Sequence, residues 1–166
     1  AYRQLAKAYD RAEMFQQASE SYEELFKLDP RDFRVAIQVS EVNIAGGNFG
    51  KAMRWAEKAI TSSKSGQAYA QRGNVYYKAF QECRSADISV DDRIVASLAH
   101  ESFTVAEEND YNRFHNSLVW LEENEVLFGR SQWFMLDANK KKQGYVKPGS
   151  ECYKWVEKKL DKDPNW

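Results

Sequence analysis

A repeated spacing constrains the fold of this chain more than any other feature of its sequence. Ala6 is followed 34 residues later by Ser40, and Ala18 is followed at the same interval by Ala52. Self-similarity at a fixed period of about 20–50 residues indicates an architecture that stacks one small supersecondary unit on the next. The pattern comprises Leu5, Ala6, Tyr9, Ala18, Tyr22, Leu25 and Pro30 in the first unit and Val39, Ser40, Ala52, Ala56 and Ala59 in the second.

A third unit follows the second and contains an insertion. Its two halves match the earlier units only if the polar stretch near 83–92 is set aside. Such an insertion fits a longer connection between two helices, because loops tolerate added residues better than packed elements do. The first half is carried by Tyr69, Gly73 and Tyr76, and the displaced second half by Ala99, Phe103 and Ala106.

The apolar residues of each unit have helical spacing, which predicts a pair of helices per unit. Small residues such as Ala6, Ser40 and Gly73 allow neighbouring helices to approach closely, and large residues such as Tyr22 fill the space between pairs. One hairpin cannot bury its apolar face alone, so the units must stack. Helices are expected at 2–12, 15–28, 32–45, 48–62, 67–84 and 91–108.

These offsets resemble those of the tetratricopeptide repeat (TPR) family. The resemblance covers about two thirds of the chain. It implies an all-α fold, namely a right-handed α-α superhelix or TPR solenoid, which we expect to end in an aromatic-rich C-terminal cap. Two positions depart from the family pattern: Asn43 stands where Tyr is usual, and Lys64 stands where Pro would close the second repeat.

The domain organisation that follows has helical repeats at 1–128 and a capping segment at 129–166. Residues 1–128 carry 15 basic and 20 acidic side chains, whereas residues 129–166 carry 9 basic and 5 acidic ones. The repeats are expected at 1–32, 33–65 and 66–109, with a partial fourth at 110–128 whose helix covers 111–127. In the capping segment we expect a helix near 132–138, a solvated loop at 140–142 and a last helix at 151–161.

Few residues in the chain suggest catalysis. His100 and His115 are the only histidines, and neither belongs to a metal-binding spacing such as H-E-x-x-H. Adjacent Asp91 and Asp92 fit solvated capping positions better than an acid–base pair, because neighbours in a helix do not share a face. We therefore expect no enzyme activity, no catalytic residue, no metal site and no cofactor.

Charge and hydropathy exclude two further classes of partner. The chain has 24 basic and 25 acidic side chains, which leaves no overall positive charge for nucleic acid. No apolar run is long enough for a transmembrane segment.

Trp120, Trp133 and Trp155 are expected to pack in the core or the cap, whereas Trp166 is expected to be disordered at the terminus.

Cys83 and Cys152 are too few for a disulfide framework or a structural zinc site. We expect two ordinary, half-buried thiols. A single bridge between them stays open, because the distance and orientation of the two side chains decide whether it forms.

The chain begins at Ala1 inside a helical pattern, so we expect the natural N-terminus to lie upstream. The compartment, cytoplasmic or exported, therefore stays open.

The resemblance implies a function in protein–protein interaction, with a peptide or partner protein bound in the concave groove that the first helix of each pair lines. We expect a non-catalytic scaffold. Two alternatives stay open: a self-assembly module that forms a homo-oligomer, and a regulatory domain of a larger protein. Transferred to this chain, the groove positions fall on Arg3, Lys7, Arg34, Ile37, Glu41, Asn74, Tyr77 and Lys78.

Overall fold

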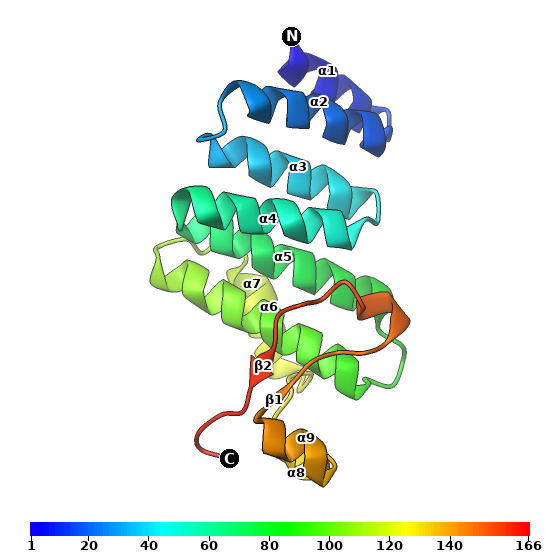
Figure 1. The fold of residues 1–166 in the computed structure, drawn as a ribbon, viewed down its shortest axis with the longest axis vertical. Helices are drawn as coiled ribbons and strands as arrows, with labels where there is room; N and C mark the ends of the chain where they lie inside the picture. Colours follow the sequence, from blue (N-terminus) through cyan, green and yellow to red (C-terminus); the bar gives the residue numbers. More distant parts are fainter.

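The computed structural model describes residues 1–166, which form nine α-helices, one short 3-10 helix and two short strands. Figure 1 shows the first six helices stacked in chain order along the molecule. These are α1 (Tyr2–Arg11), α2 (Phe15–Leu28), α3 (Phe33–Ala45), α4 (Phe49–Ser63), α5 (Gly66–Cys83) and α6 (Val90–Glu108). They are followed by α7 (His115–Glu123), α8 (Arg130–Phe134), α9 (Ala138–Gln143), β1 (Tyr145–Val146), the 3-10 helix η1 (Glu151–Tyr153) and β2 (Leu160–Asp161).

Each of the first six helices begins and ends within one residue of its predicted bounds. Polar side chains define their starts: Asn48, Ser65 and Ser89 each accept a backbone N–H at the N-terminus of the helix that follows. Consecutive helices pack against each other from α1 to α7. The chain is therefore mostly helical, with the sequential packing that the repeated spacing predicts.

The recurring small residues lie where helices approach most closely. Ala6, Ala18 and Ala52 are completely buried. At Gly73, an added Cβ would lie 2.6 Å from a ring carbon of Phe103, so α5 and α6 could not keep this distance with any larger side chain. The small residues thus set the separation of the helices.

Buried polar side chains tie three of the hairpin helices together. Asn43 Nδ2 donates to Ser19 Oγ at 2.9 Å, which joins α3 to α2. Gln71 Nε2 donates to Ser40 Oγ at 2.9 Å, which joins α5 to α3. Asn43 stands where the resemblance to tetratricopeptide repeats led us to expect Tyr, and its hydrogen bonds explain why a polar residue is accommodated there.

The C-terminal third differs from expectation in its secondary structure. The helix expected at 111–127 is shorter and covers only α7, and the single helix expected near 132–138 is replaced by α8 and α9. Lys140 to Lys142 belong to α9 rather than to a loop. The last helix expected at 151–161 does not form, and β2 pairs antiparallel with β1 instead, with Val146 opposite Leu160.

The absent last helix has a physical explanation. Tyr153, Val156 and Leu160 have helical spacing in sequence, and all three are buried, but in one core with α5, α6 and α7. Residues 144–166, which we call the C-terminal strap, run back across α6 in Figure 1 and contact α5 through η1. Docking on existing helices buries these side chains without a helix of their own, so their spacing was misleading.

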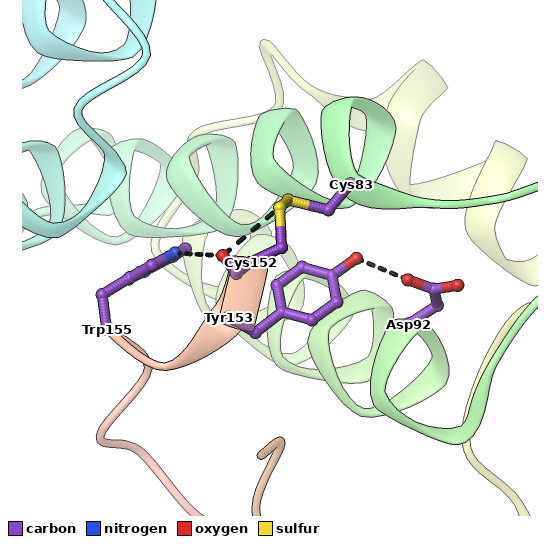
Figure 2. Close-up of a disulfide and its surroundings, with 5 residues drawn as sticks. All are labelled: Cys83, Asp92, Cys152, Tyr153 and Trp155. Carbon is purple, nitrogen blue, oxygen red and sulfur yellow. Dashed lines mark hydrogen bonds between the residues drawn. A yellow bond between two sulfur atoms is a disulfide. The ribbon is translucent and has the colours of Figure 1, made fainter. Parts of the chain in front are cut away.

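A disulfide joins the strap to the end of α5. Cys83 and Cys152 have Cα atoms 6.1 Å apart and are bonded through their sulfur atoms, as Figure 2 shows. The expectation of two ordinary thiols is therefore wrong. Beside the bridge, the Trp155 indole N–H donates to the carbonyl of Cys152 at 3.0 Å, and its ring stacks on Phe49 and Tyr76.

Adjacent Asp91 and Asp92 at the start of α6 also hold the strap. Asp91 Oδ2 accepts the backbone N–H groups of Gly149 and Ser150 at 3.1 and 2.8 Å. Asp92 Oδ1 accepts the hydroxyl of Tyr153 at 2.6 Å, with both side chains buried (Figure 2). The two carboxylates were expected only to cap a helix in solvent, and they are instead a docking point for a distant segment.

The terminal tryptophan is packed rather than free. The Trp166 ring lies 5.8 Å from that of Phe128 and 6.0 Å from that of Trp133, measured between centroids. Aromatic pairs at this separation contribute to packing beyond the area they bury. The end of the strap is therefore part of the molecule's core, contrary to the expectation of a disordered terminus.

Candidate functional site

The predicted groove residues lie on α1, α3 and α5, the first helices of the three pairs. They differ in accessibility. Arg3, Lys7, Arg34, Glu41 and Lys78 are exposed, and Asn74 is half-buried. We call these six residues the α1–α3–α5 site.

The other two predicted residues belong to the core. Ile37 is 4% exposed and packs with the first two hairpins. Tyr77 is 8% exposed, and its ring meets those of Phe103 and Trp120 edge to face. Both side chains hold helices together and have little surface left for a partner.

The cations of the site are largely free of internal partners. Arg3 donates to the Gln38 side chain at 3.1 Å, and the Arg34 guanidinium lies 5.5 Å from the centre of the Phe33 ring. Lys7, Arg34 and Lys78 take part in none of the ion pairs of the structure. Their charges are therefore available to a ligand.

Protein atoms around Glu41, in the middle of α3, partly desolvate its carboxyl group. Desolvation raises the pKa of its carboxyl, Arg113 partly opposes this rise, and Asp10 adds to it. The side chain is nevertheless exposed. Water therefore still reaches a carboxylate that protein atoms partly surround, and Asp10 on α1 and Arg113 before α7 lie close enough to affect it electrostatically.

Asn74 provides the clearest unmet hydrogen bond of the molecule. Its Oδ1 atom is buried and accepts no hydrogen bond. Buried polar atoms without a partner are rare because each costs about 1–3 kcal/mol. Asn74 on α5 and Glu41 on α3 hold equivalent places in neighbouring repeats, and these two helices contact each other. The two acceptors therefore belong to one region.

A hollow lies between α4, α5 and the strap, where sequence reasoning expected nothing. It has a volume of about 680 Å³ and is lined by Met53, Arg54, Tyr76, Trp155 and Lys158 among others. Arg72, which lines it, donates to Ser102 at 3.0 Å and lies 3.9 Å from Glu57. No signal in the sequence could have located it, because the strap forms one wall.

The remaining titratable groups form no recognisable catalytic arrangement. His100 Nε2 lies 2.8 Å from Glu122, and His115 Nδ1 lies 2.5 Å from Glu107, each an isolated pair. No three His, Cys, Asp or Glu side chains gather where they could hold a metal ion. Cys83 and Cys152 are joined in the disulfide, so neither offers a free thiol as a nucleophile.

No helix of the structure has both the length and the apolar character needed to cross a bilayer. No protein-family model matches the chain, and none of the curated proteins matches it either.

Proposed function

We propose that this protein is a non-catalytic interaction scaffold of the tetratricopeptide type, a right-handed solenoid that binds a peptide or partner segment on the α1–α3–α5 site. The observation that carries the proposal is the buried, unpartnered Oδ1 of Asn74. Asn74 as a residue is only half-buried, so a rotation of its side-chain amide brings Oδ1 to the surface. A ligand that donates a hydrogen bond to Oδ1 there removes an existing penalty, so the gain on binding exceeds that of an ordinary surface contact.

The surrounding charges indicate the chemistry of the partner. Asn74 Oδ1 can only accept, which suits a backbone N–H of an extended segment. The Glu41 carboxylate is partly desolvated, so a cationic side chain gains more there than it does beside a fully hydrated carboxylate. Packed helices lie about 8–10 Å apart, which an extended chain spans in about three residues. We therefore expect a basic residue about three positions from the residue that reaches Asn74.

The test is a selection of linear peptides from a random display library, followed by affinity measurements on variants. Asn74→Leu replaces the side chain that carries the unpartnered acceptor by an apolar one of similar size. Glu41→Gln removes the carboxylate charge. Glu82→Gln is the matched control, because Glu82 is exposed on α5 and forms no ion pair. The selected peptides should bind the control as they bind the wild type.

The expected result has two parts. Asn74→Leu should weaken peptide binding by about 10-fold while leaving the free energy of unfolding unchanged or raised. Glu41→Gln should weaken mainly those peptides that carry Lys or Arg. Peptides that bind all variants equally would place the interaction elsewhere, and a destabilised Asn74→Leu protein would show that Oδ1 is hydrogen-bonded in the free protein.

Self-assembly is a second candidate, and the outer side of α1 favours it. Tyr2 and Leu5 are 40% and 44% exposed, although large apolar side chains on later helices are mostly buried. A second copy that packs there would cover both. Sedimentation across a range of concentrations tests this: a dimer that Leu5→Glu dissociates supports assembly, and a monomer at every concentration refutes it.

The disulfide bears on the compartment. Bridges persist in oxidising environments and are rare in the cytosol. We infer that the protein works in a non-reducing compartment. Trapping thiols with an alkylating agent during cell lysis tests the inference: the protein should carry no label at Cys83 or Cys152, whereas label at both positions would contradict it.

A further inference from the structure

The α8–α9 tip, residues 130–143, combines exposed apolar side chains with clustered positive charge. Phe134 is 55% exposed and Met135 is 87% exposed, the highest value among the exposed large apolar residues. Four basic side chains occupy the same segment, Arg130 and Lys140 to Lys142, against one acidic side chain, Asp137. Asp137 is also engaged, since it accepts the backbone N–H of Lys140 at 2.9 Å as the cap of α9.

The apolar and basic groups form one patch. The Arg130 guanidinium lies 5.4 Å from the centre of the Phe134 ring, and the Lys141 ammonium lies 5.8 Å from it on the side of α9. Cations at this distance from an aromatic face are attracted to it. Two cations, one from α8 and one from α9, therefore flank the exposed Phe134 ring, and exposed Met135 follows it in the chain.

The α8–α9 tip is anchored to the core of the molecule by residues next to its exposed side chains. Trp133, next to Phe134, is 3% exposed and belongs to the main core, and its ring contacts that of Trp166. The backbone N–H of Phe128, just before α8, donates to Ser97 on α6 at 2.8 Å. Phe134 and Met135 are thus exposed although α8 is docked on the core, because α8 turns one side to the core and the other outward.

We propose that the α8–α9 tip docks the protein on the surface of a membrane that contains anionic lipids. Figure 1 shows α8 and α9 projecting at the end of the molecule opposite the N-terminus, so the tip can meet a surface before any other part does. Apolar side chains that enter the headgroup region, together with cations around them, are the combination by which peripheral proteins bind anionic bilayers.

The shape of the patch favours a bilayer over an acidic protein. Phe134 and Met135 line none of the five hollows with the best-defined walls, and 55% and 87% of their surfaces are exposed to solvent. A stable protein interface needs roughly 1,200 Å² or more of complementary surface, whereas a fluid bilayer accepts two protruding side chains without a preformed pocket. The site is also separate from α1, α3 and α5, so membrane docking does not depend on the proposed peptide binding.

The experiment is co-sedimentation of the oxidised, full chain with vesicles of phosphatidylcholine alone and of phosphatidylcholine mixed two to one with phosphatidylglycerol. We expect binding to the anionic vesicles only, weakening as salt rises because the charges become screened. Each lysine near an anionic surface contributes about five-fold in binding. Lys140→Gln, Lys141→Gln and Lys142→Gln together should therefore reduce the partition coefficient about 100-fold.

Two further variants separate specific docking from general charge. Phe134→Ser with Met135→Ser should reduce the partition coefficient about 30-fold, because two apolar side chains no longer enter the bilayer. The matched control, Lys27→Gln with Lys58→Gln and Lys64→Gln, removes three exposed lysines outside the tip and outside the α1–α3–α5 site and should change it less than about three-fold. All these positions are exposed or half-exposed, so the variants should fold.

Several outcomes would overturn the proposal. One is a wild type that does not sediment with anionic vesicles, and another is a control variant that loses as much binding as the tip variant. Binding that survives Phe134→Ser with Met135→Ser, and that soluble polyglutamate displaces fully, would assign the patch to an acidic polypeptide instead.

Discussion

The disulfide between Cys83 and Cys152 should contribute a large share of the stability of this protein. The two residues are 69 positions apart in sequence. Closing a loop of this size removes conformational entropy from the unfolded chain worth about 4 kcal/mol. Native domains have a total stability of about 5–15 kcal/mol. Replacing both cysteines by Ser should therefore leave a folded but much weaker protein, because Tyr153 and Val156 stay available to dock the strap.

Urea unfolding followed by tryptophan fluorescence measures this effect. With a denaturant dependence of about 2 kcal/mol per molar, the midpoint should fall by about 2 M. Two controls separate the bridge from the substitutions: reductant should lower the midpoint of the wild type to that of the variant, and should leave the variant unchanged. If the oxidised wild type and the double variant unfold at the same urea concentration, the loop-closure reasoning is wrong.

Three other substitutions test the packing and charges described above. Gly73→Ala should lower the free energy of unfolding by about 1–3 kcal/mol despite the higher helix propensity of Ala, because the new Cβ would meet Phe103; a thermal melt at or above that of the wild type would refute this close approach. Tyr153→Phe should cost about 2 kcal/mol in urea unfolding, since buried Asp92 loses a hydrogen-bond donor, and an unchanged midpoint would mean that Asp92 finds another donor. Because desolvation raises the pKa of Glu41, the native state binds its proton more tightly than the unfolded state does, and stability falls as pH rises above the ordinary pKa of Glu, about 4.3. Glu41→Gln should therefore be more stable than the wild type at neutral pH and not in acid. Parallel pH profiles of the free energy of unfolding for the two proteins would contradict the raised pKa of Glu41.

The pairing of the helices was predictable because its signals are local. The recurring small residues, the apolar spacing and the polar caps such as Asn48 and Ser65 act within a few residues of each helix end. For that reason the first six helices agree with the sequence prediction to within one residue.

The candidate site was predictable only in part. Equivalent offsets in successive repeats located Arg34, Glu41 and Asn74 on α3 and α5, where the first two are exposed and the third is half-buried. The same offsets also selected Ile37 and Tyr77, which are buried. Whether such a position is exposed or buried depends on how closely the next helix and α7 approach it, and a periodic pattern carries no information about that distance. The desolvation of Glu41 likewise depends on protein surface contributed by other helices.

Repetition in the amino-acid sequence was sufficient to establish the helices and their order, because each hairpin depends on contacts between residues close in the chain. The course of the C-terminal strap depends on contacts between residues far apart, such as the Cys83–Cys152 bridge and the bonds from Asp91 to Gly149 and Ser150. In sequence, Tyr153, Val156 and Leu160 fit a helix as well as a docked segment, and both arrangements bury the same side chains. The folded surface of α5 and α6 favours the docked segment, because it offers a partner for the Tyr153 hydroxyl, a sulfur for Cys152 and apolar area for the rest.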